Sequence, residues 1–169
     1  MLRKPTLADA EAVFARYASD VDVTRYVGWP RHQSVEDSEV FLRFSEAEWD
    51  KWPAGPYLIE SRLDQQLLGG TGFAFESPTV ATTGYVLAKD SWGRGYATET
   101  LMAMVNIAQE MQLGQLYALC HPDNAASIRV LNKCNFELAR QGPDQALEFP
   151  NLNPGSREHC LRYVWQVPS

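Results

Sequence analysis

Two stretches near the start of the chain carry apolar residues at the three- and four-residue spacing of an amphipathic helix. Residues 6–9 (TLAD) form a capping box that starts the first helix, and Ser34 with Asp37 starts the second in the same way. The segment 45–56, which contains two tryptophans, is predicted to be a loop. The positions predicted to face the core are Ala10, Val13, Phe14 and Tyr17 in the first helix, and Val40, Phe41 and Phe44 in the second.

Short apolar runs further along the chain predict strands. The predicted strands are residues 57–63, 67–75, 85–87, 116–120, 136–140 and 160–165. The first two are joined by a hairpin turn at 64–66, whereas residues 76–81 and the Pro/Gly/Asn-rich segment 142–156 are predicted to be loops.

Two further helices are interleaved with these strands. A glycine-bearing turn follows Leu87, and a helix pattern then begins at Ala97 and continues to an expected stop at Gly114. Asn124 caps the last helix, and Asn135 takes the left-handed position at its end. The apolar side of that helix is formed by Ile128, Leu131 and Cys134. The order α-α-β-β-β-α-β-α-β-β predicts an α/β (α+β) fold with a mixed sheet, as a single domain over residues 1–169.

Composition and charge narrow the class of protein. The chain of 169 residues is 45% hydrophobic and 21% charged, as in a soluble globular domain, and its apolar runs are too short to span a bilayer. The net charge of −6 argues against a nucleic-acid partner, which needs a basic surface. No signal peptide is visible, and three scattered cysteines indicate reduced thiols in a cytoplasmic protein. No Cys/His cluster has the spacing of a metal site.

The strand, glycine turn and helix around residues 85–98 predict an anion site. Gly93 and Gly95 permit unusual backbone angles and close approach by a ligand, and the following helix start offers unpaired N–H groups and positive potential. A dinucleotide fingerprint would need glycine where Thr98 stands, and no Gly-Lys-Ser/Thr sequence of a nucleoside-triphosphatase loop is present. A plain strand–helix connection remains the alternative on spacing alone.

Two motifs together resemble a known family. WGRGYATE at 92–99, followed by N-x-x-S-x-R-V-L-x-K-x-x-F at 124–136, resembles the GCN5-related N-acetyltransferase (GNAT) superfamily, and most closely its ribosomal-protein N-terminal acetyltransferase (RimJ/RimL-type) branch. The likeness is strong over Thr82–Glu137. It implies a mixed, mostly antiparallel sheet flanked by helices and a coenzyme A thioester, acetyl-CoA, as the cofactor. Trp92 departs from the family loop, which usually begins with Gln or Arg.

The resemblance also implies which residues bind the cofactor. The loop and helix start that would hold pyrophosphate comprise Trp92, Gly93, Arg94, Gly95, Tyr96, Ala97 and Thr98. Asn124 and Ser127 would contact the pantetheine or phosphate side, and Lys133 could reach the 3′-phosphate, with a solvated helix charge as the alternative. The main chain of the strand residues Tyr85, Val86 and Leu87 would supply amides to the oxyanion of the tetrahedral intermediate.

The chemistry requires a neutral amine and a departing thiolate. The family's usual glutamate and tyrosine are absent, because Thr82 and Asn132 occupy their places. By resemblance to the ribosomal branch, Ser127 would be the acid. His121 is the candidate base, with a backbone-bonded strand-end histidine as the alternative. Weaker candidates for the base are Glu60, Glu76 or a relay of water.

We therefore expect an acetyl-CoA-dependent N-acetyltransferase in which an amine attacks the thioester directly. The acceptor is a protein N-terminus or a small molecule, with a preference for a low-pKa amine because strong base candidates are missing. Trp29 and Trp52 are candidates for the walls of the acceptor site. The alternative is a catalytically inactive module that binds coenzyme A as a sensor. The oligomeric state is left open, with a homodimer as one alternative.

Overall fold

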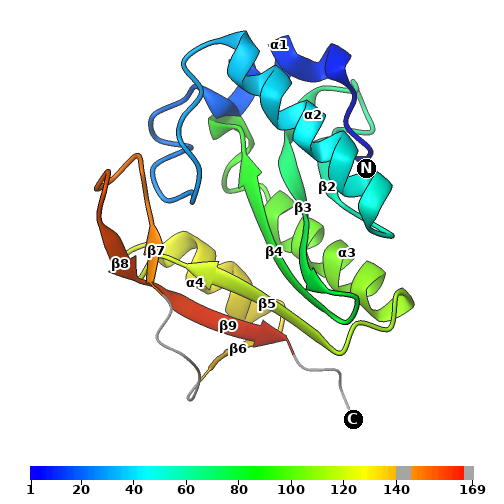
Figure 1. The fold of residues 1–169 in the computed structure, drawn as a ribbon, viewed down its shortest axis with the longest axis vertical. Coiled ribbons are helices and arrows are strands. Elements are labelled where there is room, and N and C mark those ends of the chain that lie inside the picture. Colours follow the sequence, from blue (N-terminus) through cyan, green and yellow to red (C-terminus); the bar gives the residue numbers. More distant parts are fainter. Residues whose placement is uncertain (140–145, 166–169) are drawn as a thin grey trace.

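The computed structural model describes residues 1–139 and 146–165, which form one main sheet with helices on both sides (Figure 1). Its seven strands run in the order β1-β2-β3-β4-β5-β9-β6, and a separate hairpin is formed by β7 and β8. The strands are β1 (Leu2–Arg3), β2 (Pro56–Glu60), β3 (Leu67–Ser77), β4 (Val80–Leu87), β5 (Gln115–Cys120), β6 (Phe136–Leu138), β7 (Ala146–Glu148), β8 (Arg157–His159) and β9 (Leu161–Trp165). The helices are α1 (Ala10–Val13), α2 (Val35–Lys51), α3 (Tyr96–Glu110) and α4 (Ala125–Lys133).

The alternation of side chains along the strands separates the core into two layers. Leu58 and Ile59 are neighbours on β2 but belong to different hydrophobic clusters, and the same holds for Val86 and Leu87 on β4. One layer lies under α1 and α2, and the other, larger layer lies under α3 and α4 (Figure 1). The mixed, mostly antiparallel sheet expected from the sequence is therefore confirmed.

The parallel pair β4–β5 is the feature that shapes the site. The two strands pair from Val80 with Gln115 as far as Thr82 with Tyr117, and they then diverge, although β4 continues to Leu87 (Figure 1). Along its last residues β4 pairs with β3 on one side, and among the described residues it has no strand partner on the other. Backbone groups on that free side are available to a ligand.

Helix α2 corrects two of the expectations. It continues through Lys51, so the predicted loop over 45–56 is wrong for its first half. Residues 45–51 (SEAEWDK) are mostly good helix formers, and the helix ends at Trp52, the residue before Pro53. The buried stripe is Ser38, Leu42 and Ser45, whereas the predicted inward residues Val40 and Phe44 are 67% and 56% exposed.

The turns show what local patterns could and could not predict. Both N-terminal capping boxes, the Asn124 cap and the left-handed Asn135 are confirmed. The predicted loop 76–81 is wrong, because β3 and β4 continue into a tight turn at Pro78–Thr79. The predicted loop 142–156 contains β7, while residues 142–145 lie outside the described ranges. In the first helical region Phe14 is only partly buried, but Ala10, Val13 and Tyr17 are in the core.

None of the helices over 1–139 and 146–165 has the length and apolarity needed to cross a membrane.

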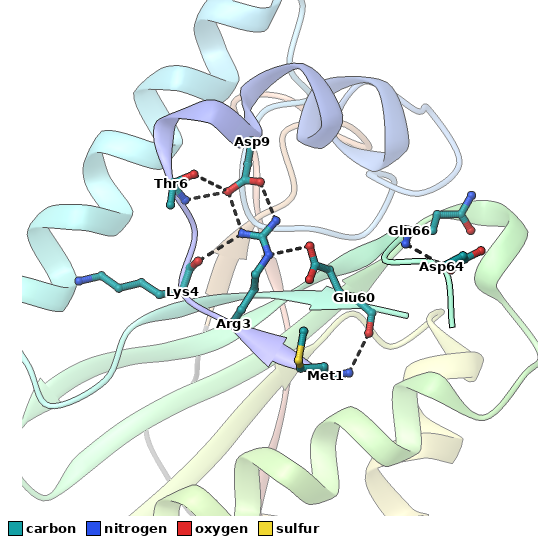
Figure 2. Close-up of polar contacts among 8 residues, drawn as sticks. All are labelled: Met1, Arg3, Lys4, Thr6, Asp9, Glu60, Asp64 and Gln66. Atoms are coloured by element: carbon teal, nitrogen blue, oxygen red, sulfur yellow. Dashed lines mark hydrogen bonds and ion pairs between the residues drawn. The ribbon is translucent and has the colours of Figure 1, made fainter. Parts of the chain in front are cut away.

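An arginine network fastens the beginning of the chain to the sheet (Figure 2). Arg3 donates to both carboxylate oxygens of Asp9, at 2.6 and 2.9 Å, and to Glu60 Oε1 at 2.6 Å. The main chains of Met1 and Glu60 bond to each other in both directions. Burial alone would raise the pKa of Asp9, but bonds from Arg3 and Thr6 outweigh it and hold that pKa below its ordinary value.

Replacing Arg3 is expected to destabilise the fold in a pH-dependent way. A carboxylate with a lowered pKa stabilises the folded state above its unfolded pKa, and this contribution is lost as the pH falls through the folded pKa. Arg3→Met should therefore cost about 1–2 kcal/mol at neutral pH, and much less near pH 3. Denaturant titrations at the two pH values measure this difference. Arg43→Met, which breaks an exposed pair with Glu39, is the control and should stay within about 0.5 kcal/mol. If Arg3→Met lowers the free energy of unfolding equally at both pH values, the role assigned to Asp9 is contradicted.

Candidate active site

The loop between β4 and α3 presents a row of unbonded amides. Within the described chain, no hydrogen bond is formed by the backbone N–H groups of residues 93–98, and the first helical bond of α3 runs from the Glu99 amide to the Gly95 carbonyl at 3.1 Å. Six consecutive donors thus lie at the positive end of a fifteen-residue helix. The arrangement suits an anion with several oxygens, such as a pyrophosphate.

Glycine is required at two positions of this loop. Gly93 and Gly95 have φ of 70° and 83°, a conformation that is strained for residues with a Cβ atom. A Cβ atom built on either glycine meets no protein atom within 4 Å, so the space beside the loop is open to a ligand. The residues present therefore fit a phosphate-bearing cofactor.

The side chains of the loop fasten it to its surroundings. Trp92, which is 47% exposed, donates from its indole Nε1 to the Leu87 carbonyl at 2.9 Å and so connects the loop to the end of β4. The Arg94 guanidinium lies 5.3 Å from the centre of the Tyr96 ring. Tyr96 and Ala97 pack against the small cluster of Ile59, Leu68 and Leu87. The loop shape is therefore set by β4 and the core as well as by glycine.

Helix α4 places Asn124, Ser127 and Lys133 along the same side of the sheet. The Asn124 side chain caps the helix by accepting from the Ser127 amide at 3.2 Å. The Tyr85 hydroxyl donates to Ser127 Oγ at 3.2 Å and links β4 to α4 across the diverging strands. Burial raises the pKa of Tyr85, which keeps its hydroxyl protonated. Lys133 is exposed at the end of α4, and the next residue, the buried Cys134, places its Sγ 3.6 Å from the Thr98 carbonyl in the first turn of α3.

His121 follows β5 and is engaged at both ring nitrogens. Its Nδ1 accepts from the Asp123 amide at 3.0 Å, and its Nε2 lies 3.0 Å from Glu158 Oε2, so the neutral ring carries its proton on Nε2. The ring is 6% exposed, stacks on Tyr26 at 5.0 Å and meets Phe149 edge-on at 4.8 Å. This geometry matches the backbone-bonded histidine considered from the sequence, and the base role stays a prediction.

Glu158 is a site residue that the sequence reasoning missed. It lies on β8, its side chain is 27% exposed, and its second oxygen accepts from the Asn153 amide group. The hydrogen bonds from Asn153 and His121 lower the pKa of Glu158, so it is a carboxylate at neutral pH. No sequence motif indicated this residue, because its segment had no strand pattern and its contact with His121 joins residues that are 37 positions apart.

The segment 19–33, here called the bridging loop, connects the free ends of β4 and β5. Asp22 pairs with Lys89 just after β4, and Tyr26 stacks on His121 just after β5. Asn151 fixes this loop to the β7–β8 hairpin with three hydrogen bonds. Its Nδ2 donates to the Thr24 and Trp29 carbonyls at 2.8 and 2.9 Å, and its Oδ1 accepts from the Arg31 amide at 2.7 Å.

The remaining residues predicted from the sequence, two tryptophans and Glu60, lie in three different parts of the structure. Trp29 belongs to the bridging loop and packs against the cluster under α1 and α2. Trp52 stacks on Phe75, which pairs with Ala81 near the beginning of β4, so the structure does not bring it together with the free ends of β4 and β5. Glu60 is bound by Arg3.

Two further features concern Glu76, a weaker base candidate, and the possibility of a bound metal ion. Glu76 on β3 accepts from the hydroxyl of Tyr117, which belongs to the part of β5 that is still paired with β4. No set of three or more His, Cys, Asp or Glu residues within 1–139 and 146–165 could hold a metal ion.

The family follows from a comparison with known proteins. A profile of the acetyltransferase (GNAT) domain matches residues 1–137. The chain belongs to the GNAT acetyltransferase family. Acetyl transfer is therefore its class of reaction. The uncharacterised N-acetyltransferase YoaA of Bacillus subtilis (strain 168) is 31% identical over 157 residues, which are 91% of this GNAT chain and 87% of YoaA.

Solved structures share the GNAT fold at lower identity. The acetyltransferase of Salmonella typhimurium that modifies the N-terminal serine of ribosomal protein L7/L12 superposes with a TM-score of 0.82, at 20% identity, over 99% of this chain and 94% of that one. The microcin C7 self-immunity acetyltransferase MccE, solved with acetyl-CoA and AMP, has a TM-score of 0.83 at 20% identity, over 98% and 91%. At this level of identity the likeness establishes the fold.

Removing the left-handed glycine at the start of α3 is expected to abolish cofactor binding. Gly95→Val forces a β-branched residue to φ near +83°, which costs about 1–2 kcal/mol or reshapes the loop. Calorimetric titration with acetyl-CoA should show affinity reduced by roughly tenfold or more, because the amides no longer share one orientation. The control Gly114→Ala, beyond the other end of α3, should bind normally. Unchanged affinity of Gly95→Val would contradict the assignment of the loop.

Proposed function

We propose that the protein is an acetyl-CoA-dependent N-acetyltransferase of the ribosomal-protein N-terminal type, acting on an α-amine or a similarly weakly basic amine. The observation that carries this proposal is the row of six unbonded amides at residues 93–98, beside strands that diverge. Two comparisons support it, because MccE was solved with acetyl-CoA and the Salmonella typhimurium protein acts on an N-terminal serine.

The cofactor would be held by the elements already described. Acetyl-CoA supplies an acetyl group that a thioester activates toward an amine. The amides of residues 93–98 would bind its pyrophosphate, and Asn124 and Lys133 would contact the cofactor from α4. The free side of β4 at Tyr85, Val86 and Leu87 offers backbone groups to the reacting carbonyl.

The proton on the amine decides which acceptors can react. An α-amine with a pKa of about 7.7–8.0 is neutral in roughly one molecule in ten at pH 7, whereas a lysine with a pKa of about 10.4 is neutral in roughly one in a thousand. The positions of the family glutamate and tyrosine hold Thr82 and Asn132, so strong base catalysis is missing there. This absence supports a weakly basic acceptor.

The His121–Glu158 pair would serve the amine. Because both ring nitrogens of His121 are bonded, the ring has no free lone pair, and its partly exposed partner Glu158 is the better group to attract the amine and accept its proton. His121 would then orient Glu158 and stabilise its charge. On the other side, Ser127 would donate a proton to the leaving thiolate, with its hydroxyl positioned by Tyr85.

A panel of acceptors tests this function. Thiol release from acetyl-CoA should be measured with a lysine-free tripeptide that has a free N-terminus, and with an Nα-blocked peptide that contains one lysine. At pH 7 we expect kcat/KM to be roughly 100-fold higher for the α-amine, in the ratio of the neutral fractions. Cofactor binding without turnover on either class, or on small amines, would instead identify an inactive coenzyme A-binding module.

Replacing Glu158 tests the assignment of the base. Glu158→Gln should lower kcat/KM for the α-amine peptide by roughly 10–100-fold, without changing acetyl-CoA affinity. Because the pKa of Glu158 is lowered, it stays ionised through neutral pH, and the acid limb of the wild-type profile should follow the pKa of the acceptor amine. The control is Glu137→Gln on β6, which is exposed. A rate equal to wild type in Glu158→Gln would exclude Glu158 as the base.

A further inference from the structure

A cavity lies where the bridging loop meets the β7–β8 hairpin. It has a volume of about 420 Å³. Its lining residues are Val21, Thr24, Pro30, Arg31, Gln33, Pro150 and Asn151. Both walls are held by the Asn151 bonds to the Thr24 and Trp29 carbonyls and the Arg31 amide, so the cavity does not depend on a ligand for its shape.

Arg31 gives this cavity its chemical character. It is the one ionisable side chain among the seven residues that line it. Its backbone amide and carbonyl are bonded to Asn151 and Gln33, but within the described residues its guanidinium has no hydrogen bond or ion pair. The other lining residues are half apolar and half polar, and a guanidinium in such a cavity can recognise carboxylate or phosphate through paired hydrogen bonds.

The cavity shares its walls with the surroundings of His121. One wall is the bridging loop, whose Tyr26 stacks on His121. The other begins at Pro150, directly after Phe149, which contacts the same ring edge-on. An acceptor whose amine lies near Glu158 therefore has this cavity as a neighbouring place for the rest of the molecule.

We propose that Arg31 makes the protein selective for acceptors that carry an anionic group, a carboxylate or a phosphate, near the reacting amine. This inference rests on the proposed function, because it identifies the part of the acceptor that the bridging loop recognises. A peptide with an acidic residue after its first residue and a small amine with a phosphate share this chemistry.

Matched pairs of acceptors test the selectivity and distinguish the two sources of the anion. The peptide pair is Ser-Glu-Ala amide and Ser-Gln-Ala amide, and the small-amine pair is phosphoethanolamine and ethanolamine. In at least one pair, the wild-type protein should prefer the anionic member by roughly fivefold or more in kcat/KM. Arg31→Gln should remove that preference while changing the neutral member less than about twofold. Arg43→Gln, an exposed arginine on α2, is the matched control and should retain it.

Three outcomes decide the proposal. Loss of the preference in Arg31→Gln alone supports it. No preference in either pair, or a preference that persists in Arg31→Gln, overturns it and leaves the proposed function standing. If no amine is acetylated, the proposed function fails. Calorimetry with the N-acetylated Ser-Glu-Ala and Ser-Gln-Ala amides then tests the role of Arg31. Tighter binding of the acidic peptide by the wild-type protein, lost in Arg31→Gln, supports the proposal. Equal binding of the two peptides overturns it.

Discussion

The separation of β4 from β5 after Thr82 and Tyr117 is the constraint on which the rest of the molecule depends. A sheet normally bonds every interior strand on both sides, whereas in the described structure the end of β4 is paired with β3 alone. The same separation requires other elements to connect the two halves of the sheet. Tyr85 and Ser127 do so on the α4 side, and the bridging loop does so at the free strand ends. The gap between the ends of β4 and β5 is thus maintained by contacts among the elements around it.

The two sides of this opening are built differently. The side proposed for the cofactor is local, because the end of β4, two left-handed glycines and the start of α3 follow one another within 14 residues from Tyr85 to Thr98. The side proposed for the acceptor is assembled from distant segments, namely the bridging loop, the end of β5 and the β7–β8 hairpin, which are joined at His121 and Asn151. The profile of the GNAT domain covers residues 1–137, so it includes the bridging loop and the end of β5 and ends before the hairpin begins. Of the segments on the acceptor side, only the β7–β8 hairpin lies outside the part of the chain that matches the family profile.

Sequence reasoning was accurate where the physics is local. The Thr6 and Ser34 capping boxes, the Asn124 cap and the left-handed Asn135 each depend on neighbours a few residues away, and all were predictable. It was wrong for Val40 and Phe44, because the face of α2 toward the sheet is made by small serines and Leu42, which only the packing reveals. Glu158 could not be found, since its proposed role depends on a histidine 37 positions earlier and on a hairpin whose strands the sequence pattern did not predict. Trp52, an aromatic residue in an apparent loop, proved to be part of the packing around Phe75.

The hydrogen bonds of Asn151 affect the order in which the protein can fold during its synthesis. They join residues 120 to 127 positions apart, so the bridging loop obtains its anchor only after Asn151 has left the ribosome. The loop with the unbonded amides of residues 93–98 is translated well before that moment. In a nascent chain this local turn can therefore form early, whereas the bridging loop is anchored last, because its contacts are the most distant in sequence.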